Sequence, residues 1–296
     1  MNKIEFYKNR SLGERFSASA AFIRQNWKVM YKIILIPSIP LALLQGYFQQ
    51  DYSQFWANLP KLFDGDTSWL SEISNNNSGI SSLIALLFAL VLSSISSAIM
   101  SRYEEGSLSM ETSLQDLSSK IVSNMKKLFF IGLTLSVMGI VAVIPIGLII
   151  GILFAAHLPV LAAIVVFLLI VAICAIIPFL YLARFPALFR GEPTMGSIRK
   201  GFRLGFKNWG STYAMIIILG IATSVISLIL GVPYTIYLLF GQPTGVVAYI
   251  LGSISWLGAA FITPLTFVFF AFQYFAIAEN EESISLQAKV EEFDNL

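Results

Sequence analysis

The sequence predicts an all-α polytopic membrane protein: six transmembrane helices in three repeats of one amphipathic interfacial helix plus two membrane-spanning helices. The first observation is composition, because 56% of the 296 residues are apolar, only 12% are charged and the mean hydropathy is +0.76. Soluble domains carry about a quarter charged residues. The second is that the apolar residues gather into six runs, each long enough to cross a bilayer. The third is that a basic or polar segment with helical periodicity precedes every second run.

The first amphipathic segment, 12–28, is expected to lie in the lipid headgroup layer. Ser11 and Glu14 have the spacing of a capping box, which predicts a helix start. Apolar side chains then recur on one face and cations lie opposite: Phe16, Ala20, Ile23 and Trp27 against Arg24 and Lys28. A membrane-spanning helix is expected from Tyr31 to Phe48, and the polar residues 49–78 are expected to form a loop.

The other spanning helices are predicted at 80–100, 128–154, 160–183, 213–237 and 249–277. Prolines remove backbone donors and are expected to kink these helices at Pro37, Pro40, Pro145, Pro233 and Pro264. Small residues spaced for close helix packing mark the second and third spans: Ala85, Ala89, Ser93, Ser97 and Ser101, then Gly147 and Gly151. Packing with hydroxyls bonded back to the helix is favoured for the serines over a polar path.

The second and third amphipathic segments support an internal repeat. Leu114, Ser118, Ile121 and Met125 form one face, and Ile198, Phe202, Gly205 and Trp209 form its counterpart. Aligning the segments brings Asn26, Asn124 and Asn208 together, where they are expected to cap the junction with the following span rather than bind a ligand jointly. The resulting units are about 10–102, 110–184 and 194–278 within a single membrane domain. An acidic tail, 279–296, follows.

The cations predict the orientation of the chain. Seven Lys and Arg residues lie in 1–32, four in 102–127, six in 184–211 and one in the tail, whereas Lys61 stands alone on the other side. Basic residues accumulate in cytoplasmic loops, so both termini are expected in the cytoplasm. No acidic residue lies deep within a span, which argues against ion-coupled transport.

The chemistry of a site is sparse in this sequence. A lone cysteine, Cys174, and a lone histidine, His157, exclude Cys clusters and His-rich metal sites. Asp64 and Asp66, with Glu72, are better explained as a polar turn than as a calcium loop. No nucleophile elbow, P-loop or paired catalytic carboxylate is found. The chain is therefore expected to be no enzyme and to use neither cofactor nor metal; an adjacent anionic membrane explains the basic stripes better than nucleic acid does.

Two stretches carry a resemblance to a known group of proteins. These are RFPALFRGEPTMGSIRKGFRLGFKNWGS at 184–211 and ERFSASAAFIRQNWK at 14–28. The pattern resembles an uncharacterised bacterial six-span membrane family, similar to YciC-like proteins and to the membrane domain of glycerophosphodiester phosphodiesterases. The resemblance implies an all-helical inner-membrane fold. It does not imply phosphodiesterase activity, since the barrel domain that carries it in that family is not expected here.

Two functions follow from these observations. The first is a non-catalytic membrane protein that binds lipids or envelope partners through its basic segments. The expected anionic-lipid contacts are Arg24, Lys28, Lys120, Lys126, Lys127, Arg199, Arg203 and Lys207. The acidic tail is expected to compete for the same cations. The alternative is a passive or lipid-type transporter with a groove between the repeat units.

Overall fold

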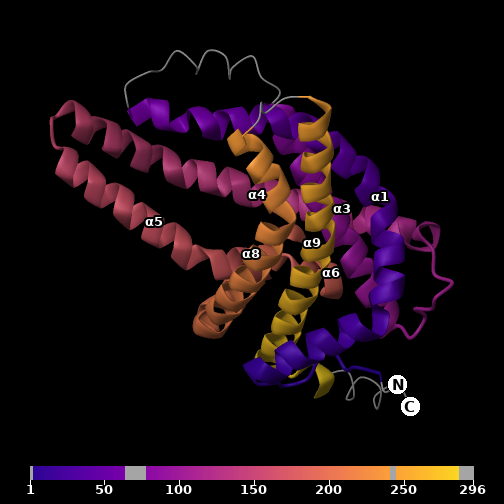
Figure 1. The fold of residues 1–296 in the computed structure, drawn as a ribbon. Coiled ribbons are helices and arrows are strands. Elements are labelled where there is room, and N and C mark those ends of the chain that lie inside the picture. Colours follow the sequence, from indigo (N-terminus) through magenta and orange to yellow (C-terminus); the bar gives the residue numbers. More distant parts are fainter. Residues whose placement is uncertain (1–2, 64–77, 241–244, 287–296) are drawn as a thin grey trace. The chain divides into compact units, whose positions relative to one another are not determined.

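The computed structural model describes residues 3–63, 78–240 and 245–286, and these residues form eight helices and no strand. The helices are α1 (Leu12–Phe63), α3 (Ser78–Glu104), α4 (Leu114–Ala155), α5 (Pro159–Leu182), α6 (Phe185–Arg190), α7 (Thr194–Lys207), α8 (Trp209–Phe240) and α9 (Val246–Glu282) (Figure 1). Six stretches, in α1, α3, α4, α5–α6, α8 and α9, are long and apolar enough to cross a membrane. The chain is therefore an all-α, multi-pass membrane protein, as the sequence predicts.

The chain divides into two compact units, each built from separate stretches of sequence. Unit 1 comprises 1–19, 122–217 and 269–296, and unit 2 comprises 20–121 and 218–268. Four helices, α1, α4, α8 and α9, contribute residues to both units. The boundaries of the units do not coincide with those of the three sequence repeats, which remain a prediction.

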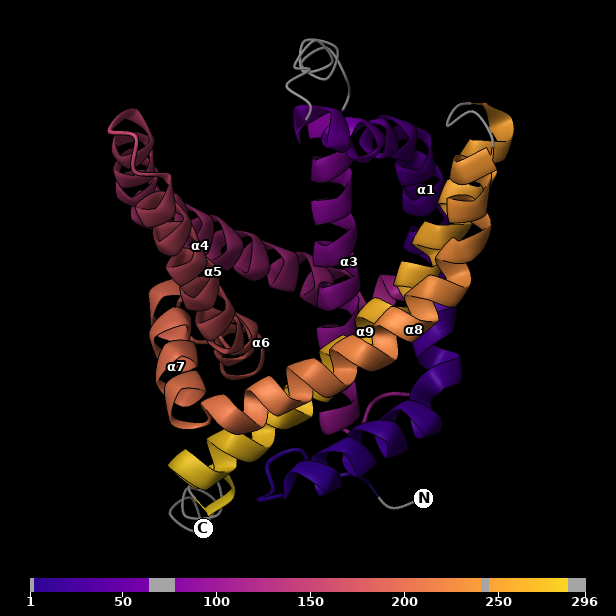
Figure 2. The same ribbon diagram turned by 60° about the vertical axis from the view of Figure 1, so that its left-hand side comes forward.

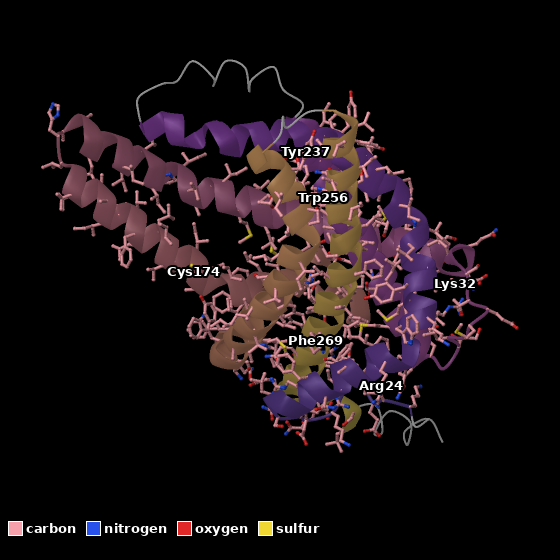
Figure 3. The ribbon with its side chains drawn as sticks, viewed as in Figure 1. Arg24, Lys32, Cys174, Tyr237, Trp256 and Phe269 are labelled. Atoms are coloured by element: carbon pink, nitrogen blue, oxygen red, sulfur yellow. The ribbon has the colours of Figure 1, made fainter. Side chains whose placement is uncertain are left out.

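Helix α1 joins the first amphipathic segment and the first span in one bent helix. The predicted capping box starts it, because the Glu14 carboxylate accepts hydrogen bonds from the backbone N–H and the hydroxyl of Ser11 at 2.7 and 2.8 Å. In Figure 3 the helix bends between Arg24 and Lys32, near the predicted junction. The Nδ2 of Asn26, within this bend, donates to the carbonyl of Phe22 at 2.9 Å.

The predicted loop at 49–78 is wrong over its first half, since α1 continues to Phe63. Apolar and aromatic residues recur with a helical period among the polar residues of this stretch, at steps of three or four: Phe48, Tyr52, Phe55, Leu59 and Phe63. Residues 64–77, which include the Asp64, Asp66 and Glu72 turn, lie outside the described residues. Helices α4, α8 and α9 continue through Pro145, Pro233 and Pro264.

Unit 2 packs α1 and α3 together with parts of α8 and α9. The Nε2 of Gln45 on α1 donates to the Ser81 hydroxyl of α3 at 2.8 Å, with both side chains buried. A Cβ at Gly46 would lie 2.6 Å from the backbone nitrogen of Ser253, so α1 and α9 approach closely there. Trp256 of α9, labelled in Figure 3, meets Phe88 of α3 edge to face.

The small-residue stripe of α3 packs over only part of its predicted length. Ser93 and Ser97 are buried, as are Ser94 and Ser96, whose hydroxyls donate to the carbonyls four residues earlier at 2.7 Å. The prediction of packed serines bonded back to the helix is therefore confirmed for Ser94 and Ser96. Ala89, by contrast, is exposed and Ala85 is half-buried. The packing prediction is therefore wrong at Ala89, because the stripe turns out of the core in the first half of α3.

The parts of α4 and α5 that lie in unit 1 form a long hairpin, in which the two helices run side by side (Figures 1 and 2). None of the most apolar window of α4 is buried, and only 6% of that of α5. At Gly147 and Gly151 an added Cβ would have nothing within 4 Å, so the predicted role of these glycines in helix packing is wrong. Glycine spacing permits close approach, but among the described residues of unit 1 no helix lies within 4 Å of this face.

The end of α9 organises the rest of unit 1. The ring of Phe6 stacks on Phe275 at 4.8 Å, which holds the N-terminal segment against α9. The buried amide of Gln273 accepts a hydrogen bond from Arg15 at 2.9 Å. Its Nε2 donates to the hydroxyls of Ser211 and Thr212 at 3.1 Å. This amide therefore links α1, α8 and α9, and its hydrogen bonds offset the cost of burying it.

Candidate functional site

The third amphipathic segment, α7, is fixed in place by small residues. A Cβ at Gly201 would lie 2.6 Å from the backbone nitrogen of Ala183, and one at Gly205 would lie 2.6 Å from Cδ1 of Phe179. Because both positions lack a side chain, α7 touches the backbone around the end of α5 directly. Figure 2 shows α7 running beside α5 and α6.

A buried serine continues the same stripe one turn earlier. The Ser197 hydroxyl donates to the carbonyl of Ala183 at 2.6 Å and accepts from the backbone N–H of Ala187 at 2.8 Å. Ala187 and Ile198 are buried together with Ile131 of α4. Helix α6 is capped at its C-terminus by Gly191, whose φ of +67° places it in the left-handed region that glycine tolerates. These contacts fix the position of Arg190, the last residue of α6.

Four cations from α6 and α7 face carboxylates at the end of α9 and in the α6–α7 turn. Arg190 and Arg203 both pair with Glu282, and Lys200 pairs with Glu192. The Nζ of Lys200 also lies 4.0 Å from Glu282, and Lys207 pairs with Glu281 at 2.5 Å. These residues, without Glu192, line an open depression of about 510 Å³. We call the seven residues the charge cluster: Arg190, Glu192, Lys200, Arg203, Lys207, Glu281 and Glu282.

The cations of the charge cluster stay partly exposed, and one of its carboxylates has a lowered pKa. The hydrogen bond from Lys200 holds the pKa of Glu192 below its ordinary value. The Arg203 and Lys207 side chains remain more than half exposed, whereas that of Glu282 is 14% exposed. Surface pairs of this kind contribute little to stability individually, typically about 0–1 kcal/mol. The exposed pair of Lys207 with Glu281 therefore adds little to the stability of the fold.

The predicted lipid-contact residues divide into two groups. Arg24, Lys28, Lys126 and Arg199 are exposed. The Nζ of Lys28 lies 5.8 Å from the centre of the Trp27 ring. The others have protein partners: Lys120 pairs with Glu105 at 2.7 Å, Lys127 donates to the carbonyl of Ala187 at 3.0 Å, and Arg203 and Lys207 belong to the charge cluster.

A second glycine turn, before α4, resembles the turn before α7. Gly106 has a φ of +73°, like Gly191, and follows the end of α3 as Gly191 follows α6. Lys120 on α4 pairs with Glu105 beside this turn and holds the pKa of that carboxyl low. Ser113 and Asp116 form a second capping box, in which the carboxylate accepts from the Ser113 N–H at 2.8 Å. This box was not predicted, although its spacing is readable in the sequence.

Asn208 separates α7 from α8, where its backbone leaves the helical conformation with φ −116° and ψ 29°. Its Nδ2 donates to the carbonyl of Leu204 at 3.3 Å, the same four-residue step that Asn26 makes. Asn124, the third aligned asparagine, is buried. The two equivalent hydrogen bonds support the prediction that these side chains stabilise the helix junction.

Sequence reasoning missed Arg190, Lys200 and Glu192 as site residues. Arg190 and Glu282 are 92 positions apart, and no local spacing connects them. Lys200 and Glu192 lie on either side of the start of α7, so a helix drawn from Thr194 could have suggested that pair.

Within the described ranges, no three His, Cys, Asp or Glu side chains are grouped so that they could hold a metal ion. Comparison with protein-family models, curated proteins and solved structures gives no match for this chain.

Proposed function

We propose that this chain is a non-catalytic integral membrane protein that holds anionic lipid at its amphipathic segments. The observation that carries the proposal is the outer surface of α7. There Phe206 is 77% exposed between Arg203 and Lys207, while the opposite face packs against α5 and α6. An exposed ring flanked by cations is typical of a helix at a membrane surface, with the ring in the acyl boundary and the cations at lipid phosphates.

Exposed cations outside the charge cluster give the sharpest test of lipid binding. Arg199→Glu reverses an exposed cation on α7, and each cation near an anionic surface contributes about 1 kcal/mol. We expect roughly fivefold weaker retention of phosphatidylglycerol during purification, measured by lipid mass spectrometry. Lys8→Glu is the matched control, because Lys8 is exposed but lies outside the amphipathic helices. Equal phosphatidylglycerol in both variants and in the wild type would refute the proposal.

We further propose that the chain lies in a bacterial inner membrane with both termini in the cytoplasm. Eighteen of the nineteen Lys and Arg residues fall in the segments that the predicted spans place on the same side as the termini. The test uses single cysteines in a Cys174→Ser background. Gly79→Cys introduces an exposed thiol at the start of α3, and Ser119→Cys introduces one on α4, beyond the other end of α3. An impermeant thiol reagent should label position 79 in intact cells and position 119 only after permeabilisation. The reverse pattern would invert the topology.

A passive or lipid-type transporter is the second candidate, and a groove between α8 and α9 in unit 2 favours it. Ser227, Ser255 and Thr263 line this groove of about 300 Å³ within the membrane-spanning stretches. The Ser255 hydroxyl oxygen is buried without a hydrogen-bond partner, which is costly in an apolar setting. In proteoliposomes, a transporter would expose an inner-leaflet fluorescent lipid to dithionite, and Ser255→Val would change that rate. Full protection of the inner leaflet would exclude this function.

A further inference from the structure

One carboxylate stands at the centre of three cations in the charge cluster. Arg190 pairs with Oε2 of Glu282 and Arg203 pairs with Oε1, so the two guanidinium groups engage different oxygens. The Lys200 ammonium lies 4.0 Å from Oε2. Two guanidinium donors on different oxygens, with a third cation nearby, form a pattern that also fits a tetrahedral anion, because a phosphate offers more oxygens and more charge than a carboxylate.

The position of Glu282 at the end of α9 is electrostatically unfavourable for a carboxylate. It is the last residue of α9, where the helix dipole disfavours negative charge. The next residue, Ser283, has a φ of +47°, a left-handed conformation that a residue other than glycine adopts at a cost. The three cations therefore hold Glu282 in place more than the helix does, and a stronger anion can compete with it.

The charge balance of the cluster points the same way. Four cations face three carboxylates, and Glu281 and Glu192 are each engaged by a separate lysine. Displacement of Glu282 leaves Arg190 and Arg203 without a carboxylate at one open depression, which Lys200, still paired with Glu192, also lines. Arg and Lys side chains in this number are typical of protein sites that bind phosphate.

We propose that Arg190, Lys200 and Arg203 form a binding site for a phosphate group, which Glu282 occupies until a phosphate displaces it. The proposal rests on the proposed function and adds its regulation: Glu282 limits access to the strongest cation site of the amphipathic segments. The phosphate comes either from a lipid headgroup or from a free phosphate anion, and the experiment separates the two.

The experiment measures thermal unfolding of the full chain in detergent, with three probes. These are dioctanoyl phosphatidic acid, dioctanoyl phosphatidylcholine and inorganic phosphate. Glu282→Gln keeps the side-chain shape and removes the competing charge. Without a probe, this variant should unfold at a lower temperature than the wild type, because three cations lose a shared partner. We expect it to bind phosphatidic acid about tenfold more tightly. This is the effect of one charge-assisted hydrogen bond, which the cations regain with the lipid phosphate.

Glu281→Gln is the matched control, since its carboxylate pairs with Lys207 and does not contact the three cations. Its affinity for phosphatidic acid should change far less. Tighter binding of phosphatidic acid alone by Glu282→Gln identifies a lipid headgroup site, and an equal gain for inorganic phosphate identifies a site for free phosphate. Adding Arg190→Gln to Glu282→Gln should abolish the gain in either case.

Unchanged affinity of Glu282→Gln for both anionic probes would overturn the proposal and leave Glu282 as a structural ion pair. So would a gain that survives Arg190→Gln. The lipid-binding function itself is tested separately by Arg199→Glu, which lies outside the cluster. Loss of phosphatidylglycerol in that variant, together with no effect of Glu282→Gln, would refute only the regulation.

Discussion

Two glycine pairs with the same spacing behave in opposite ways in this protein. Gly147 and Gly151 on α4 have nothing within 4 Å of an added Cβ, whereas Gly201 and Gly205 on α7 touch the backbone and ring of residues on and after α5. Both pairs follow the small-xxx-small spacing that permits close helix packing. The difference shows that this spacing permits contact and that the neighbouring chain decides whether contact forms.

At α7 the contact depends on hydrogen bonds between a polar side chain and the neighbouring backbone. Ser197 extends the α7 stripe to three small residues and bonds the backbone at both Ala183 and Ala187. The residues around Gly147 and Gly151 are apolar and exposed, among them Leu148 and Ile152, and lipid contacts satisfy them equally well. Hydrogen bonds that cannot be made to lipid thus favour packing at α7, while α4 gains little from a protein partner.

The largest expected effect comes from an alanine at Gly201. The added Cβ meets the backbone of Ala183, which cannot move aside as a flexible side chain would. We expect a loss of about 1–3 kcal/mol in the free energy of unfolding, the usual cost of overpacking. Thermal unfolding in detergent measures it.

Gly147→Ala is the control for that comparison, because the same substitution enters open space on α4. Replacing glycine by alanine within a helix favours the helix by up to about 1 kcal/mol. This variant should be unchanged or slightly more stable. A loss as large as that of Gly201→Ala would mean that α4 packs on a partner and would remove the contrast.

Ser197→Ala tests the polar part of the contact and should have the next largest effect. It leaves the backbone N–H of Ala187 and the carbonyl of Ala183 buried without their shared hydroxyl. Such losses cost about 1–3 kcal/mol. Ser119→Ala, at an exposed position, should stay within about 0.5 kcal/mol of the wild type. Equal melting temperatures for the two variants would show that shape alone holds α7.

The smallest effect is expected for Ala89→Leu on α3. Ala89 is exposed, although it lies on the same stripe as the buried Ser93 and Ser97. A leucine there meets lipid, so stability should change by less than about 0.5 kcal/mol. A loss above about 1 kcal/mol in thermal unfolding would mean that the whole stripe is packed, as the sequence alone suggests.

The sequence predicts the number and positions of the spans well, because long apolar runs report directly on the membrane. It also predicts the Ser11–Glu14 box and the back-bonded serines, which depend on neighbours in the chain. It does not separate packed faces from lipid-facing ones, since both are apolar in a membrane protein. That is why the spacing of Ala89, Gly147 and Gly151 predicts packing that is not observed, whereas the same spacing at Ser197, Gly201 and Gly205 marks a contact that forms.

The sequence predicts Arg203 and Lys207 of the charge cluster and the involvement of the acidic tail, but it does not predict which residues pair. The cations of α7 follow a helical period that is visible in the sequence, and the acidic tail was expected to compete for them. The individual pairs of Arg190 and Arg203 with Glu282 join residues 92 and 79 positions apart. Such contacts depend on how the helices pack, which local periodicity does not encode.

The hydrogen bond between Arg15 and Gln273 has a consequence for the timing of assembly. The two residues are 258 positions apart in the chain. At a synthesis rate of about 5–20 residues per second, the partner of Arg15 emerges from the ribosome roughly 15 to 50 seconds later. Phe6, whose partner Phe275 is made at nearly the same moment, waits as long. During that interval the early segment must rest on the membrane surface or on another protein, and the last helix to be inserted completes the place of the first.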